Sequence, residues 1–152
     1  MIDVLPPPLI SFLLGGAPIS EVRGAAIYSF GVDNPLLMVF GMVGNMLAAI
    51  ALLVLWDLLN IEEIGRRIVG KRLDKLIERY HKTHELGETI ALAIFIGIPL
   101  PVTGVYTGIL LGKILRISNW KILTASAIGI LIASLIMYLA LSGIVSFLSF
   151  FT

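Results

Sequence analysis

A glutamate and an arginine stand two residues apart in the stretch GAPISEVRGAAIYSFG, residues 16–31, whose other side chains are mostly apolar or small. Glu21 can take up or release a proton, and the planar guanidinium of Arg23 suits a phosphate or another anionic group. Charged side chains at membrane depth are paired or face water, because an isolated charge in lipid is costly. The pair is therefore either a structural ion pair between two parts of the fold or a substrate and proton-coupling site.

If the pair is a substrate and proton-coupling site, the substrate must meet one condition. If Glu21 and Arg23 stay paired throughout, Glu21 cannot exchange a proton near neutral pH, so the substrate must compete for Arg23. Glu21→Gln is then expected to remove the pH dependence of transport while binding is retained. Asn45, in the middle of a long apolar stretch, fits an interhelical hydrogen bond better than a substrate ligand.

A second polar stretch, GIPLPVTGVYTG, covers residues 97–108. Thr103, Tyr106 and Thr107 carry hydroxyl groups that could line a cavity opposite Glu21 and Arg23. Proline and glycine interrupt a helix in both stretches, and glycine also allows close helix packing, as in the G-x-x-x-G pair Gly108 and Gly112. The residues expected at the two helix breaks are Pro18, Gly24, Pro99, Pro101 and Gly104.

Composition indicates that these stretches belong to an integral membrane protein. The 152 residues are 58% hydrophobic and only 14% charged, and the mean hydropathy is +1.01. Residues 36–59 and 122–142 are long enough to span a bilayer, which takes about 20 helical residues. Residues 9–32 and 88–113 are broken near their middles, so each arm of about ten residues reaches half the bilayer. We expect two re-entrant hairpins whose tips are covered by protein or face water.

The basic residues predict the topology. Residues 60–87 carry seven lysines and arginines, and residues 113–121 carry three more. All ten lie on one face if residues 88–113 enter and leave on the same side, and the positive-inside rule assigns that face to the cytoplasm. We expect a single all-α, multi-pass domain over 1–152, built from two inverted repeats of hairpin and transmembrane helix. The amphipathic segment 60–87 joins them on the cytoplasmic surface.

No pattern in the chain predicts an enzyme active site. His81, His84, Glu85 and Glu88 share one helix face, but their order differs from the zincin motif, so we interpret them as a solvated surface patch. The sequence has no cysteine, no P-loop and no nucleophile elbow. We therefore expect no enzyme, no metal, no cofactor and no nucleic-acid partner.

The two broken stretches together resemble the small multidrug export protein family, whose paired motifs are P-x-x-E-x-R-G-A and P-L-P-x-T-G. The layout of the family covers nearly the whole chain, although AIYS and PVTG depart from its usual pattern beside the motifs. The family is similar, more distantly, to DedA and VTT-type proteins, which implies paired re-entrant loops and proton-coupled movement of lipids such as polyprenyl phosphates. The matching residues are Pro18, Glu21, Arg23, Gly24 and Ala25, then Pro99, Leu100, Pro101, Thr103 and Gly104.

These observations predict a secondary transporter or a DedA-like lipid flippase that moves an amphiphilic substrate, including anionic lipid phosphates. Two alternatives stay open: a small multidrug or cation exporter, and a non-transporting protein that assists assembly or organises lipid. A water-accessible cavity between the hairpin tips favours transport, whereas a dry contact favours a structural role. We also expect a homodimer or higher homo-oligomer surrounded by lipid, because two spans and two half-spans leave little interior. Small residues expected at helix contacts are Gly41, Gly44, Ala48, Ala49, Ala125, Gly129 and Ala133.

Overall fold

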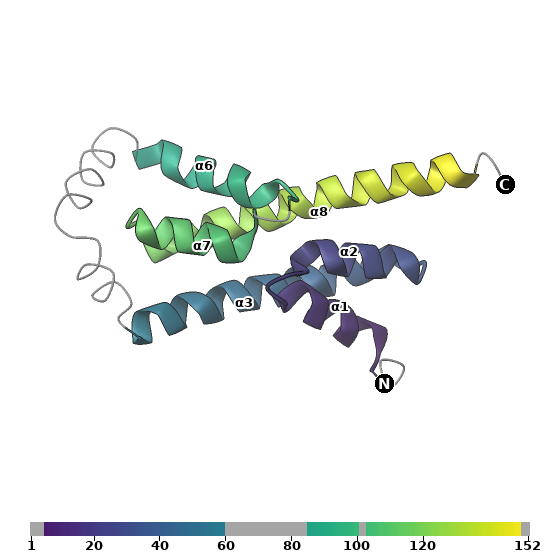
Figure 1. Ribbon diagram of the computed structural model, residues 1–152, viewed down its shortest axis with the longest axis horizontal. Coiled ribbons are helices and arrows are strands. Elements are labelled where there is room, and N and C mark those ends of the chain that lie inside the picture. The colour runs from purple at the N-terminus through teal and green to yellow at the C-terminus, as the bar shows by residue number, and fades with distance from the viewer. Residues whose placement is uncertain (1–4, 60–84, 101–102, 150–152) are drawn as a thin grey trace.

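The computed structural model describes residues 5–59, 85–100 and 103–149, and these segments contain helices and short connections but no β-strand (Figure 1). The predicted all-α fold is confirmed for this part of the chain. The predicted amphipathic segment 60–87 lies outside the described residues as far as residue 84, and so do His81, His84 and Pro101. The helices are α1 (Pro7–Gly16), α2 (Glu21–Gly31), the 3-10 helix η2 (Pro35–Leu37), α3 (Met38–Leu58), α6 (Glu85–Gly97), α7 (Val105–Ile114) and α8 (Asn119–Ser149).

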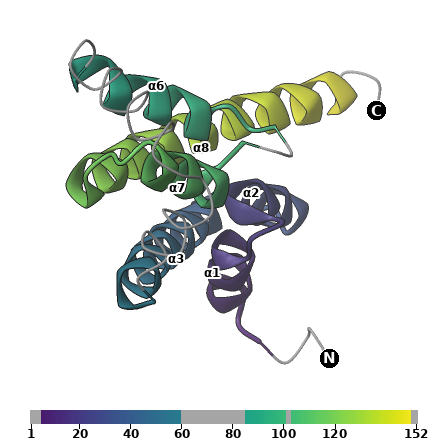
Figure 2. The same cartoon turned by 60° about the vertical axis from the view of Figure 1, so that its left-hand side comes forward.

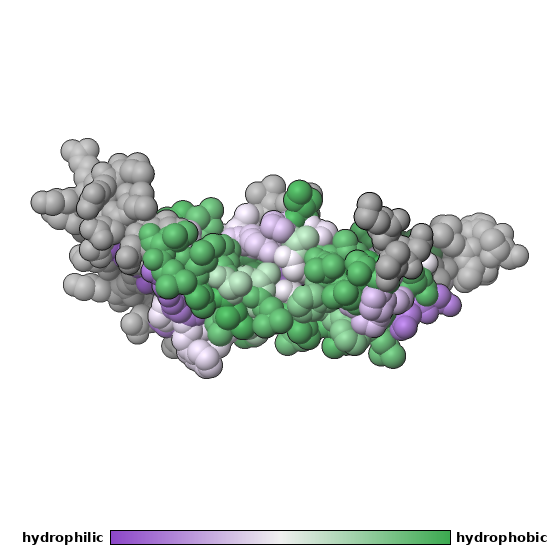
Figure 3. Space-filling model, turned by 90° about the horizontal axis from the view of Figure 1, so that it is seen from below, coloured by the Kyte–Doolittle hydropathy of each residue, from purple (hydrophilic) through white to green (hydrophobic). Residues whose placement is uncertain are grey.

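Two of the helical segments are long and apolar enough to cross a membrane, as predicted. Pro35–Leu58 has 24 residues and Asn119–Ile144 has 26, each with a hydropathy of 2.3. Many of their large apolar side chains are exposed, among them Leu36 and Leu131. Figure 3 shows mostly hydrophobic surface along the molecule, with hydrophilic residues toward the two ends and in a central patch. Such a surface suits contact with lipid.

Two pairs of short helices pack on the long ones. α1 and α2 lie against α3, while α6 lies against α8, and α7 contacts both α3 and α8. The chain breaks between α1 and α2 and between α6 and α7 lie near the middle of the long axis, and the two pairs open toward opposite ends of the molecule (Figures 1 and 2). The broken ends of both pairs therefore meet near the centre of the fold.

Small residues let these helices approach closely. A Cβ atom on Gly15 would overlap the Gly41 carbonyl, and one on Gly44 would overlap the Phe12 carbonyl, so α1 lies directly on the backbone of α3. On the other side, a Cβ atom on Gly129 would lie 2.6 Å from Cβ of Ile96. Small residues that we expected at helix contacts thus pack within one chain. The buried ones are Gly41, Gly44, Ala49, Ala125, Gly129 and Ala133.

The turns that lead from α2 toward α3 and from α7 into α8 share one backbone geometry. Asp33 and Arg116 each adopt a left-handed conformation, with φ of 54° and 57°. In both turns the next residue donates its N–H to the carbonyl five positions earlier, at 2.9 Å for Asn34 and 2.8 Å for Ile117. This hydrogen bond is the one that closes a Schellman helix end. In both halves, the same kind of turn leads the chain from a short helix back along the following long helix.

Candidate functional site

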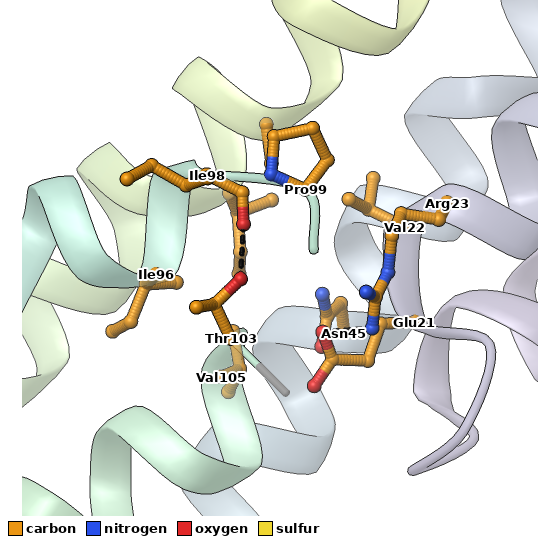
Figure 4. Close-up of a pocket in the computed structure, with 11 residues that line it drawn as sticks. Glu21, Val22, Arg23, Asn45, Ile96, Ile98, Pro99, Thr103 and Val105 are labelled. Carbon is orange, nitrogen blue, oxygen red and sulfur yellow. Dashed lines mark hydrogen bonds and ion pairs between the residues drawn. The ribbon is translucent and has the colours of Figure 1, made fainter. Parts of the chain in front are cut away.

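A small cavity lies where the two helix breaks meet, between α2, α3, α6, α7 and α8. Glu21, Arg23 and Asn45 gather on one side of it, and Ile96, Ile98 and Thr103 lie on the other (Figure 4). Its volume of about 10 Å³ is close to the minimum that holds one water molecule. Ile130 and Ala133 of α8 complete the wall.

The cavity lies halfway along both long helices. Asn45 is within two residues of the middle of Pro35–Leu58, and Ile130 and Ala133 flank the middle of Asn119–Ile144. One residue advances a helix by about 1.5 Å, so all three side chains stand within a few ångströms of the midpoints. The polar groups of this site therefore lie near the middle of both membrane-length helices.

Glu21 and Arg23 come from the first turn of α2. Glu21 begins the helix in a left-handed conformation with φ of 48°, which is uncommon for a residue other than glycine. The Arg23 guanidinium lies 3.5 Å from the Glu21 carboxylate, and the two side chains are 16% and 6% exposed. The predicted ion pair is therefore formed, and it is almost completely buried.

Both members of the pair also reach across to the other broken helix. Arg23 Nη1 donates a hydrogen bond to the Leu100 carbonyl, which follows the end of α6. Glu21 Oε1 accepts the backbone N–H of Tyr106, at the start of α7, at 3.4 Å. Helix ends carry unpaired carbonyls with partial negative charge, and helix starts carry unpaired N–H groups with partial positive charge. The cation thus lies near the end of α6 and the anion lies at the start of α7.

Side chains also hydrogen-bond to backbone carbonyls at the α1–α2 break, and one of them comes from the second half of the chain. The Tyr106 hydroxyl donates a hydrogen bond to the Gly16 carbonyl, the last residue of α1. Ser20, in the α1–α2 break, donates its hydroxyl to the Leu14 carbonyl at 2.6 Å. Each break therefore uses side chains, including one from the opposite half, to satisfy backbone groups that lipid could not satisfy. We call the contact formed by Glu21, Arg23, Leu100, Gly104 and Tyr106 the tip junction.

Gly104 allows the two breaks to meet. It precedes α7 with φ of 149° and ψ of −171°, a conformation that is essentially restricted to glycine. A Cβ atom at this position would overlap the Glu21 carboxylate. The predicted tip residue Gly104 is thus required twice, once for its backbone angle and once for the space that Glu21 occupies.

The other predicted residues have more local contacts. Thr103 Oγ1 accepts the Leu100 N–H at 3.1 Å and donates to the Ile98 carbonyl, so it shapes the α6–α7 connection and lines the cavity with Pro99. The Thr107 hydroxyl donates to the Gly104 carbonyl at 3.3 Å, within its own helix turn, and does not line the cavity. In the first break, Pro18 lies in the turn between α1 and α2, and Gly24 packs against Ser20.

Asn45 is more closely tied to the cavity than the sequence suggested. Its side chain is buried at 1% exposure, and within the described part of the chain its Oδ1 atom accepts no hydrogen bond. A buried amide oxygen without a partner is costly, so a donor is expected to bind beside it in the cavity. The available signal was a single asparagine in the middle of a mostly apolar span.

A second polar cluster, which the sequence did not predict, joins the ends of three helices. The buried Lys113 ammonium of α7 lies 2.6 Å from Asp57 Oδ1 of α3, and Asn119 of α8 donates to Asp57 Oδ2 at 2.6 Å. Lys113 was interpreted only as one of the basic residues that set the topology. Nothing in the spacing of Asp57 and Lys113 indicates that they meet.

The position of Glu88 contradicts the solvated patch that we expected from the sequence. We expected it on a solvated patch with His81, His84 and Glu85, but its side chain is only 1% exposed. The interpretation was wrong for this residue because α6 turns Glu88 toward α8, where Lys121 Nζ lies 3.9 Å from its Oε2 atom. Among the residues for which positions are described, no three histidine, aspartate or glutamate side chains converge on a possible metal site.

Comparison with known proteins assigns the family. Residues 21–136 match the family model described as "Putative small multi-drug export protein". No curated protein and no solved structure matches the chain. The matched region begins at Glu21 and contains the tip junction, the α6–α7 break, α3 and the first part of α8, and it is more than half of the sequence. Together with the two membrane-length apolar helices, the match confirms the predicted resemblance: this chain is a membrane protein of the small multidrug export family.

Proposed function

We propose that this protein is a secondary transporter that exports small amphiphilic molecules across the cell membrane, and that the tip junction closes its pathway. The observation that carries the proposal is the position of the junction. Two broken helix pairs meet through Glu21 and Arg23 halfway along two membrane-length helices. Secondary transporters place substrate and ion sites at such meetings of broken helices near the midplane. The family description supports export.

The proposed topology is two inverted repeats, each a re-entrant hairpin followed by a span. Its support is the opposite opening of the α1–α2 and α6–α7 pairs (Figure 1). Further support comes from backbone angles: Gly104 follows Glu21 by 83 residues, and Arg116 follows Asp33 by the same 83. These four residues have positive φ, and the offset relates the start of α2 to the start of α7. The basic residues assign segment 60–87 to the cytoplasm.

In this proposal the described conformation is the closed one. A cavity of about 10 Å³ does not admit an amphiphile, so the broken ends must separate before substrate passes. Separation exposes the Leu100 carbonyl and the Tyr106 N–H, while Glu21 and Arg23 become free to bind a proton and an anionic group. The left-handed backbone conformation of Glu21 fits a site that has two arrangements.

Two further candidates each have one observation in their favour. Transport of an anionic lipid phosphate, as in a DedA-like flippase, is supported by the buried guanidinium of Arg23, for which a phosphate would replace the Leu100 carbonyl. A non-transporting role in assembly or lipid organisation is supported by the nearly dry contact between the breaks. None of the three roles requires a catalytic group or a cofactor. Each is compatible with a homodimer, which crosslinking in native membranes would test.

Transport in proteoliposomes separates these functions. Wild type, Arg23→Lys and Arg23→Ala would be compared with a cationic dye and a fluorescent polyprenyl phosphate, with and without a pH gradient. Export predicts gradient-dependent dye movement in wild type that is lost in Arg23→Ala. Movement of the lipid alone would favour the flippase, with Arg23→Lys retaining part of it. If neither substrate moves through correctly folded wild type, the export proposal is wrong and the structural role remains.

A further inference from the structure

We infer that the tip junction cavity binds a single water molecule, which Asn45 holds in place and which exchanges protons with Glu21. The volume of the cavity, about 10 Å³, is close to that needed for one water molecule and leaves no room for a larger ligand. A buried water also needs about two to four polar partners. Four polar side chains line this cavity: Glu21, Arg23, Asn45 and Thr103 (Figure 4).

Asn45 is the residue that calls for a water at this place. Its side chain is 1% exposed, and within the described part of the chain its Oδ1 atom accepts no hydrogen bond. An unpaired buried amide oxygen is destabilising, so a donor beside it is favoured. Water suits the amide in either orientation, because a water molecule both donates and accepts hydrogen bonds.

The charges around the cavity favour water over a metal cation. The Arg23 guanidinium lines the same wall, and its positive charge repels a second cation at this short range. Its N–H groups are donors, which a water oxygen can accept and a metal ion cannot. The water can therefore donate to Asn45 and to the Glu21 carboxylate while it accepts from Arg23.

The carboxylate of Glu21 has room for a hydrogen bond from this water. Its Oε1 atom accepts the Tyr106 N–H at 3.4 Å, and its Oε2 atom lies 3.5 Å from Arg23, whereas a charge-assisted hydrogen bond is about 2.7–2.9 Å long. When the water carries an extra proton, one of its O–H bonds breaks and an O–H bond forms on Glu21. A neutral water then remains beside Asn45.

Glu21 is the group that takes up the proton. Arg23 does not lose its proton in a protein, and the Tyr106 hydroxyl donates to the Gly16 carbonyl. The other titratable side chains described in the surrounding helices do not line the cavity: Tyr28, Asp57, Glu88, Lys113, Lys121 and Tyr138. The inference rests on the proposed export function only for what the proton drives, because binding of water and protonation of Glu21 need no transport.

The test uses the full-length protein in lipid nanodiscs and difference infrared spectroscopy between acidic and alkaline buffer. A bound water is identified by the shift of its band in heavy-oxygen water, and the Glu21 carboxyl by the loss of its band in Glu21→Gln. We expect a water band in wild type that changes together with the Glu21 band. Asn45→Leu should lose the water band and move the Glu21 band to higher frequency, because the carboxyl loses a hydrogen bond. Asn45→Ser, whose hydroxyl can still bind water, should keep the water band.

Two variants on α8 keep the test decisive if Asn45→Leu fails to fold. Ala133→Val adds methyl groups to the cavity wall and should expel the water while Asn45 is intact. Ser126→Ala is the control, because it also removes a buried polar atom without a described partner but does not line the cavity, so both bands should stay unchanged. The absence of a water band in folded wild type, or its retention in folded Asn45→Leu or Ala133→Val, would overturn the inference.

The same samples test for sodium in place of water. A midpoint of thermal unfolding that rises in sodium chloride but not in choline chloride, and only when Asn45 is present, would show a metal cation in the cavity and overturn the inference. We expect equal midpoints in the two salts. If both infrared bands behave as expected but no substrate moves in proteoliposomes, the export function is rejected and the water site remains.

Discussion

The carboxylate of Glu21 occupies the space that a side chain on Gly104 would need. These two residues come from different halves of the chain, and each has a backbone angle that is unusual for a helix start, with φ of 48° and 149°. Their contact joins the start of α2 to the start of α7. Because the contact is so close, the identity of residue 104 controls whether the two breaks can meet.

Gly104→Ala should destabilise the protein. The added methyl group overlaps Glu21, and alanine is strained at the backbone angle of residue 104. We expect a lower midpoint of thermal unfolding in detergent than for wild type. Gly143→Ala is the matched control, because a Cβ atom there meets no other atom within 4 Å. An unchanged midpoint for Gly104→Ala would mean that the breaks do not meet in this way.

Tyr106→Phe should weaken the link between α7 and α1. It removes the hydroxyl that donates to the Gly16 carbonyl but keeps the aromatic ring. Loss of one such hydrogen bond is expected to cost about 1 kcal/mol of unfolding free energy, which titration with a denaturing detergent can measure. Tyr28→Phe serves as the control, since the described part of the protein contains no hydrogen bond from the Tyr28 hydroxyl. An equal effect of both substitutions would contradict the assigned bond.

Asp57→Ala should be more destabilising than Asn119→Ala. Asp57 contacts both Lys113 and Asn119, so its loss removes two contacts and takes the acid away from a buried ammonium. Asn119→Ala removes only one hydrogen bond. Thermal unfolding of the two variants in detergent would give the order, and Asp57→Asn, which can still accept a hydrogen bond from Asn119, is expected to fall between them. The reverse order would show that the cluster does not depend on the aspartate.

Gly15→Ala should disrupt the packing of α1 on α3. The new methyl group would overlap the Gly41 carbonyl, which is backbone and cannot turn away. We expect reduced yield of folded protein and a lower unfolding midpoint. Gly31→Ala is the comparison, because a Cβ atom at residue 31 contacts nothing within 4 Å. Similar yields for the two variants would argue that α1 sits farther from α3.

Single cysteines should report opposite membrane sides for the two equivalent turns. The sequence has no cysteine, so Asn34→Cys and Ser118→Cys each create one unique thiol at an exposed position. The inverted-repeat topology predicts that a membrane-impermeant maleimide labels residue 34 from outside intact cells. Residue 118 should react only after the membrane is permeabilised. Labelling of both from outside would reject this topology.

Local properties of the sequence were enough to predict the helices. Runs of apolar residues in α3 and α8 predict membrane-length helices because length and hydropathy are properties of one segment. The breaks after Gly16 and Gly97 follow from the proline and glycine nearby, since proline removes a backbone donor and glycine weakens a helix. The charged pair Glu21 and Arg23 was evident for the same reason: two ions are conspicuous in an apolar chain.

The partners of those ions depended on the tertiary structure. Arg23 binds the Leu100 carbonyl and Glu21 binds the Tyr106 N–H, and these backbone groups are present in nearly every residue, so no sequence pattern marks them. The same holds for Glu88, whose burial depends on how α6 rotates against α8. Hydropathy and helix breaking act within a segment, whereas burial and hydrogen-bond pairing depend on which segments meet. The sequence alone therefore determined the elements and the charged pair, and only the folded chain decided their contacts.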